Sequence, residues 1–286
     1  MKKYFIGAVV GLAVFSLAAC GDSATPTDGT TKKSDLTLEE VYTNAMERQE
    51  SLQSVKANME MEQEMEMTVD GEEVQMTSST NVEMGITTKP MALFLDGTMS
   101  MTMAGDEASF DMPLNMYLTE ADGFYMNDSM SGGWLRLPDE MYEDLLAQVG
   151  ASADAQEQLQ QMEPFLKDLE FSQTDGDYIL TLNAKGEKFN EMLLEQVTGT
   201  LGQQLGEEEQ SIMDGTKIED AKYIITIDKE TFDMTKIVMD LVMTIDVEGV
   251  TAKVNTLTTM DYSNFNSVDS ITIPQEVLDT AVDTDF

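Results

Sequence analysis

The sequence predicts an α+β fold, in which a large antiparallel sheet of about nine to eleven strands carries helices against one face. Three observations predict this class. Long stretches alternate apolar and polar residues with a period of two, as half-buried strands do. Asp-Gly and Glu-Gly pairs separate several of these stretches, which is typical of hairpins. Between two groups of expected strands, over residues 139–205, the apolar spacing becomes mostly helical.

A tether and a helix are expected before the first strand. Residues 20–35 are rich in Gly, Ser, Thr and Asp, a composition typical of a flexible tether. Thr37 stands three residues before Glu40, which is the spacing of a capping box. An apolar stripe then runs from Leu38 to about Leu52, so we expect this helix to pack against another element.

The clearest strand pair follows the expected helix. Over residues 55–69 the odd positions are apolar, with Gln63 as the exception, and the even positions from 60 to 66 are all glutamate. Asp70-Gly71 then predicts a tight turn into a second alternating stretch. The sheet should therefore have one apolar face and one acidic face. At the other end of the chain, Ile271–Pro274 is expected to form an edge strand that leads into a short helix.

Composition excludes several classes of function. The 286 residues contain no histidine and one cysteine, which removes the usual zinc ligands and the Ser-His-Asp and Cys-His catalytic arrangements. With 54 acidic against 16 basic residues, the formal charge is −38, so the chain repels nucleic acid and anionic lipid surfaces. We therefore expect neither an enzyme nor a nucleic-acid-binding protein, and no cofactor.

The first twenty residues have the pattern of an export signal. Lys2 and Lys3 precede an uncharged run from Tyr4 to Ala19, which is shorter than the ~20 residues of a membrane-spanning helix. This run ends in Leu17-Ala18-Ala19-Cys20, which resembles the lipobox of bacterial lipoproteins. The resemblance implies that residues 1–19 are removed and that Cys20 receives a lipid. We expect residues 36–286 to form a single domain, outside the cytoplasm and anchored to the membrane through Cys20.

Methionine is unusually frequent, and more than half of the 24 methionines fall on the apolar phase of expected strands. Methionine is flexible, so a face built from it adapts to apolar ligands of varied shape. The residues expected to face such a ligand are Met59, Met61, Met65, Met67, Met76, Met84, Met99, Met101, Met103, Met112, Met116, Met239 and Met243. Two alternatives remain open: the methionines fill an ordinary core, or their thioethers bind copper(I).

Five short segments, together with the lipobox, carry a resemblance to a known group of proteins. They are Leu36–Val41, Gly123–Met126, Trp134–Leu137, Ile225–Thr231 and Ile271–Pro274. In these segments the chain resembles an uncharacterised family of lipoproteins from Gram-positive bacteria. More distantly, its order of elements is similar to the lipoprotein carrier LolA, the mycobacterial lipoproteins LppX and LprG, and the sigma-factor regulator RseB. This resemblance implies a curved half-barrel with helices on its concave face and a hydrophobic cavity between them.

These observations together predict a monomeric lipoprotein on the outer face of a Gram-positive plasma membrane. Its expected partners are the membrane, through Cys20, and a lipid or other hydrophobic molecule bound between sheet and helices. A surface interaction or sensory module with a filled core is the main alternative, and copper(I) binding is another.

Overall fold

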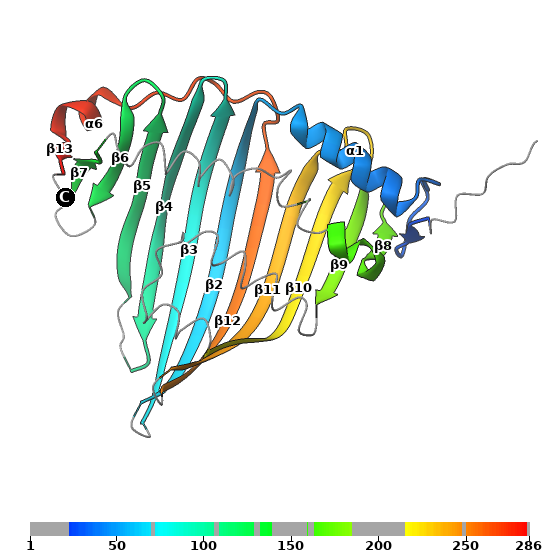
Figure 1. The fold of residues 1–286 in the computed structure, drawn as a ribbon, viewed down its shortest axis with the longest axis horizontal. Coiled ribbons are helices and arrows are strands. Elements are labelled where there is room, and N and C mark those ends of the chain that lie inside the picture. The colour runs from blue at the N-terminus through cyan, green and yellow to red at the C-terminus, as the bar shows by residue number, and fades with distance from the viewer. Residues whose placement is uncertain are drawn as a thin grey trace, which may run out of the picture.

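The structure is a computed structural model in which thirteen strands form one open, mostly antiparallel sheet (Figure 1). It describes residues 23–69, 72–105, 109–128, 132–138, 159, 163–184, 215–247 and 250–284. Across the sheet the strands follow the order β1-β8-β9-β10-β11-β12-β2-β3-β4-β5-β6-β7-β13. The expected fold class, a large antiparallel sheet with helices against it, is therefore confirmed.

The strands differ widely in length. They are β1 (Thr25–Pro26), β2 (Ser54–Val69), β3 (Glu72–Thr88), β4 (Met91–Met103), β5 (Phe110–Thr119), β6 (Gly123–Asp128), β7 (Gly133–Arg136), β8 (Glu170–Gln173), β9 (Asp177–Ala184), β10 (Thr216–Asp228), β11 (Met234–Val247), β12 (Val250–Ser263) and β13 (Val282–Asp283). The two-residue strands β1 and β13 pair in parallel with β8 and β7 at the two edges. The other strands pair in antiparallel fashion, as the sequence predicts.

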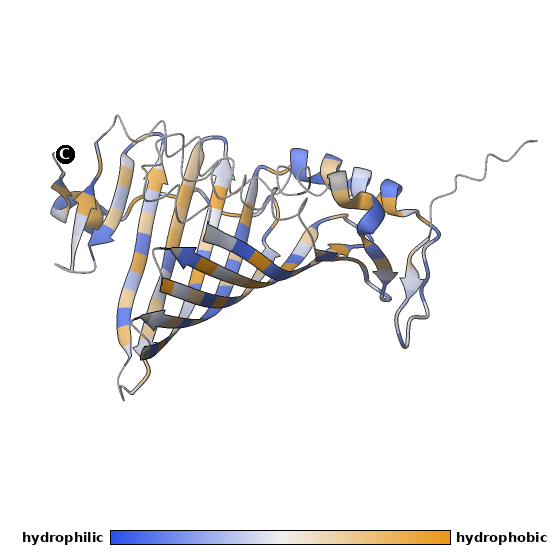
Figure 2. Ribbon diagram, turned by 60° about the horizontal axis from the view of Figure 1, so that its bottom comes forward, coloured by the Kyte–Doolittle hydropathy of each residue, from blue (hydrophilic) through white to orange (hydrophobic). Residues whose placement is uncertain are grey.

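The register is continuous across the middle of the sheet. β2 pairs with β3 from Ser54 opposite Thr87 to Val69 opposite Glu72, which confirms the hairpin expected at residues 70–71. On its other side β2 pairs with β12, so strands from the two ends of the chain lie next to each other. Hydrophilic and hydrophobic residues alternate along these strands (Figure 2). Because successive side chains point to opposite faces, this alternation places most apolar side chains on one face and most charged ones on the other.

Helix α1 (Leu38–Glu50) begins and packs as the sequence predicts. The Thr37 hydroxyl accepts a hydrogen bond from the Glu40 amide at 3.3 Å, and a Glu40 carboxylate oxygen accepts one from the Thr37 amide at 2.8 Å. Figure 1 places α1 over the end of the sheet formed by β8–β11. The buried residues there, which we call the α1 core, include Val41, Tyr42, Ala45, Leu159, Phe165, Tyr178, Leu180, Leu182, Ala221, Ile225, Ile227 and Met234.

The segment before the last helix differs from its prediction. Ile271–Pro274 forms no strand, because β13 occupies the edge beside β7 instead. Ile273 is buried against Tyr125, and helix α6 (Gln275–Thr280) follows from Pro274 as the sequence predicts. This C-terminal segment packs on the face of β5–β7 opposite to that of a second buried cluster, formed by Leu93, Leu118, Phe124 and Leu137.

Most of the helical insert expected over residues 139–205 lies outside the described residues. Within its described part, the 3₁₀ helix η1 (Glu163–Asp168) is followed by strands β8 and β9. The sequence predicts β9, with its turn at Asp175-Gly176, but it does not predict β8. With only four residues, β8 offers too little alternation to be recognised.

Gly97 on β4 lies where β4 and β3 approach each other closely. A Cβ atom there would overlap the backbone oxygen of Asn81 and lie 2.8 Å from the Cα atom of Val82. Backbone cannot move aside as a side chain can, so we expect Gly97→Ala to lower the free energy of unfolding by about 1–3 kcal/mol in urea titrations. Gly176→Ala is the matched control, because its Cβ would meet nothing within 4 Å. Equal stability of the two variants would contradict this packing.

Candidate ligand-binding face

All the methionines expected to face a ligand lie on one side of the sheet, which we call the methionine face. Residues directly opposite each other on paired strands point to the same face. Met65 lies opposite both Met76 on β3 and Val254 on β12, and Met99 lies opposite Met112 on β5. By the same register this face carries Met59, Met61, Met65, Met67, Met76, Met84, Met99, Met101, Met103, Met112, Met116, Met239 and Met243.

These methionines are not fully buried, although Met116 packs against the buried cluster of Leu93, Leu118, Phe124 and Leu137. Met103 is 53% exposed, and the others are half-buried. The α1 core, by contrast, consists mainly of Leu, Ile, Tyr and Ala, and its buried methionine is Met234, which is 1% exposed and was not among the expected residues. The methionine face therefore keeps apolar surface that another molecule can contact.

The opposite side of the sheet, the carboxylate face, carries the glutamates. Glu60, Glu62, Glu64 and Glu66 on β2 are all exposed. An ion pair on the same face joins Lys56 and Glu83 at 2.8 Å. Exposed charges of one sign keep the sheet in water and oppose association through this face. The alternation predicted from the sequence thus separates an apolar face from an acidic one.

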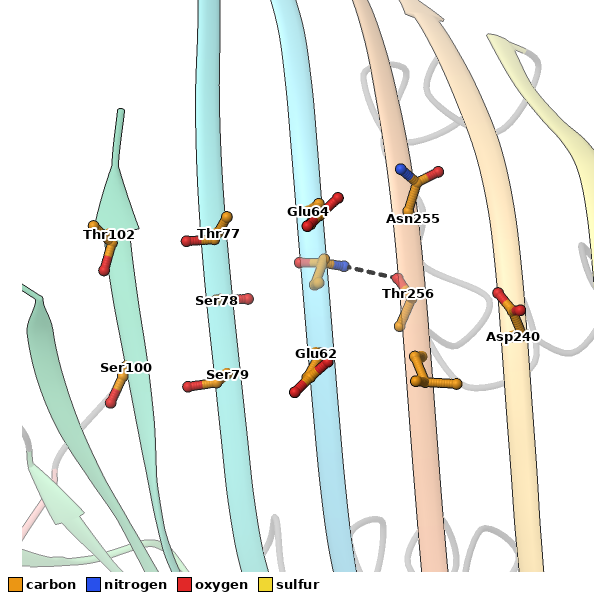
Figure 3. A pocket seen from close by; sticks show the side chains of 12 residues that line it. Glu62, Glu64, Thr77, Ser78, Ser79, Ser100, Thr102, Asp240, Asn255 and Thr256 are labelled. Atoms are coloured by element: carbon orange, nitrogen blue, oxygen red, sulfur yellow. Dashed lines mark hydrogen bonds between the residues drawn. The ribbon is translucent and has the colours of Figure 1, made fainter. Parts of the chain in front are cut away.

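Two open hollows lie on the carboxylate face of the sheet. An open hollow of about 390 Å³ lies across β4, β3, β2, β12 and β11, and Glu62, Glu64, Asp240 and Asn255 line it (Figure 3). A second one, of about 460 Å³, is lined by residues that include Glu60. Their carboxylates disfavour an apolar or anionic molecule. In the described ranges, no group of His, Cys, Asp and Glu is arranged to hold a metal ion.

The segment that follows Cys20 is held to the sheet by a buried glutamine. Gln173 on β8 is 1% exposed. Its Nε2 atom donates to the backbone oxygens of Ala24, at 2.7 Å, and Ser34, at 3.2 Å. Its Oε1 atom accepts from the Ser34 amide and from the Lys229 ammonium, each at 2.8 Å. We call this arrangement the Gln173 clamp.

Two charged residues support the clamp. The Lys229 ammonium also donates to the backbone oxygen of Lys32 at 3.0 Å, and desolvation lowers the pKa of Lys229. Asp175 accepts hydrogen bonds from the amides of Lys32, at 2.8 Å, and Thr31, at 2.5 Å, which lower the pKa of its carboxyl. The sequence predicts a flexible tether over residues 20–35, but residues 24–34 are bonded to the sheet. Cys20 itself lies outside the described residues.

Comparison with protein families places the chain in one of them. Residues 37–282 match the model described as a family of unknown function, DUF6612. The chain belongs to this family. No curated protein matches it. Within the described part of this DUF6612 member, no helix is long and apolar enough to cross a membrane.

Solved structures show distant likenesses to this DUF6612 protein. A LolA superfamily protein from Nitrosomonas europaea is 10% identical, with 85% of this chain and 97% of that one covered and a TM-score of 0.17. A DUF1329 family protein from Desulfovibrio piger is also 10% identical, with coverages of 82% and 95% and a TM-score of 0.18. A beta-barrel-like protein of DUF1849 from Brucella abortus is 6% identical, with coverages of 74% and 100% and a TM-score of 0.20.

Replacing Gln173 tests the clamp. Gln173→Ala leaves the Ala24 and Ser34 backbone groups without their buried partner, so we expect a loss of about 2–4 kcal/mol in the free energy of unfolding. Amide hydrogen exchange should quicken within residues 24–34 before it quickens in β2. Gln275→Ala is the control, because its side chain is exposed and bonds to Asp279 at 2.8 Å, one helical turn away. Unchanged exchange at residues 24–34 would show that the clamp does not hold this segment.

Proposed function

We propose that this protein is an extracytoplasmic lipoprotein, anchored through a lipid on Cys20, that binds a lipid or another hydrophobic molecule on its methionine face. The observation that carries the proposal is the half-burial of the methionines. Residues that only filled a core would be buried as Met234 is, whereas these side chains retain apolar surface across several adjacent strands. Apolar surface that is gathered on one face of a protein marks a contact site.

The chemistry of methionine supports an apolar ligand of variable shape. Its unbranched side chain has three rotatable bonds and a polarisable sulfur, so a methionine surface can repack around different partners. Removing apolar surface from water stabilises a complex by about 25 cal/mol for each Å². Met65 on β2 lies directly opposite Met76 on β3, so a ligand there would bury two adjacent thioethers.

The same two residues provide the test. The full chain, purified from host membranes and extracted with chloroform and methanol, should release lipid that mass spectrometry identifies.

In titrations with the uncharged probe N-phenyl-1-naphthylamine, we expect Met65→Gln combined with Met76→Gln to weaken binding about tenfold, which corresponds to about 1.4 kcal/mol. The substitutions keep side-chain length while adding a polar group.

The control changes the other face of the same strand. Glu64→Gln combined with Glu66→Gln should leave probe affinity within twofold of the unchanged protein, because both side chains are exposed on the carboxylate face. Thermal unfolding of all variants separates loss of binding from loss of fold. An unchanged protein that yields no lipid and binds no probe would contradict the proposed function and favour a surface interaction module.

Anchoring has a test of its own. The segment Leu17-Ala18-Ala19-Cys20 supports lipid attachment because it places the chain's only thiol directly after small residues at the end of an apolar run. Cys20→Ala should move the protein from the membrane fraction to the soluble fraction and remove an acyl mass from its N-terminal peptide. Two acyl chains give stable anchoring, whereas one binds reversibly. Retention of Cys20→Ala in membranes would contradict the anchor.

A further inference from the structure

The methionine face is interrupted near its centre by uncharged polar side chains. Thr256 on β12, Gln63 on β2 and Ser78 on β3 lie directly opposite one another in a single row across three strands. In the next row, Thr258 and Thr80 flank Met61. We call these five residues the polar patch. Leu241 and Met101 extend the first row on β11 and β4, so the patch is enclosed by apolar residues on both sides.

The polar patch has unused hydrogen-bonding capacity. Gln63 donates through Nε2 to the Thr256 hydroxyl at 3.3 Å (Figure 3). Within the part of the chain that the structure describes, the Thr80 hydroxyl has no partner, although this residue is only 5% exposed. A buried hydroxyl without a partner costs free energy that a valine of similar shape would not. Thr80 is therefore poorly suited to a face that only packs, and well suited to one that binds a polar group.

The described strands around the patch disfavour an ionised ligand group. Between the row of Ala57 and the row of Met67, none of the side chains on the methionine face of β2, β3, β4, β11 and β12 carries a charge. The chain as a whole carries −38. A carboxylate or phosphate brought here would lose its hydration and gain no cation from these five strands. An ester or hydroxyl group needs only hydrogen bonds.

The spacing leaves room for apolar chains around such a group. Two rows of the methionine face lie beyond the patch toward Ala57 and two lie toward Met67. Rows on one face repeat about every 7 Å along a strand, so each side offers about 13 Å of apolar surface. A ligand with a polar group bonded at the patch can therefore lay hydrocarbon along Met59 or Met65.

We propose that Gln63, Ser78, Thr80 and Thr256 form a subsite for the uncharged ester or hydroxyl groups of a neutral lipid, whose acyl chain lies along the methionine face. This inference rests on the proposed function and specifies the ligand class. The face selects for polarity without charge: it binds a glycerol ester more tightly than either the ionised fatty acid or the bare hydrocarbon of equal length.

Three probes with the same chain length test the selectivity. 1-Dodecanoylglycerol, dodecanoate and dodecane compete against N-phenyl-1-naphthylamine bound to the full-length protein. We expect the glycerol ester to bind about fivefold more tightly than dodecane, as one additional hydrogen bond provides, and dodecanoate to bind most weakly. Dodecanoate equal to or tighter than the glycerol ester overturns the inference but not the proposed function. Failure of all three probes to bind overturns both.

Thr80→Val tests the residue itself. Because the change removes a buried hydroxyl without a described partner, it should raise the melting temperature of the free protein. It should also weaken 1-dodecanoylglycerol about fivefold and leave dodecane unchanged. Thr77→Val, on the carboxylate face of the same strand, is the matched control and should change neither affinity. A lower melting temperature together with unchanged affinity for the ester would overturn the assignment.

A second variant covers the possibility that Thr80→Val folds poorly. Gln63→Met extends the methionine face through the patch with a side chain of similar length, and it removes the bond to Thr256. The preference for 1-dodecanoylglycerol over dodecane should fall below that of the unchanged protein. An unchanged preference would show that the patch does not set the ligand class.

Discussion

The structure depends on an unbroken register between β2 and its two neighbours. A strand shifted by one residue would turn every side chain to the other face, and would place glutamates among the methionines. That exchange would bury several carboxylates without partners, which is far more costly than any single contact in the sheet. The contrast between the two faces therefore fixes the pairing of β12, β2 and β3, and the pairing in turn assembles the methionine face from strands that are remote in sequence.

Local features of the chain were predictable for physical reasons. The capping box of α1 depends on Thr37 and Glu40, three residues apart, and the hairpin of β2 and β3 depends on one turn pair between alternating stretches. The face on which each methionine lies follows from its position in the alternation. Gln63 was visible as an exception to that pattern. Its role in the polar patch could not be predicted, because the other residues of the patch come from β3 and β12.

Features that depend on distant partners could not be derived in this way. Gln173 lies 139 residues from Ser34 and 149 from Ala24 along the chain. Nothing in the sequence around position 173 indicates these partners, and a four-residue strand has too little pattern to be recognised. Glycine-rich and polar composition predicts flexibility for the segment after Cys20. Composition gives no information, however, about hydrogen bonds between its backbone groups and a buried side-chain amide elsewhere in the chain. Pairing with β8 overrides the local preference.

The Gln173 clamp has a mechanical consequence for the proposed lipoprotein. If the first fixed residue is Ser23, which bridges to Thr37, and the acylated one is Cys20, the intervening backbone can span at most about 11 Å. Electrostatic repulsion between the acidic ectodomain and an anionic leaflet acts over about 8 Å at physiological ionic strength. The short backbone segment would keep the sheet close to the membrane, whereas repulsion between like charges would keep it away. Together they would set a definite distance between sheet and membrane, with the β1 edge of the sheet nearest the headgroups.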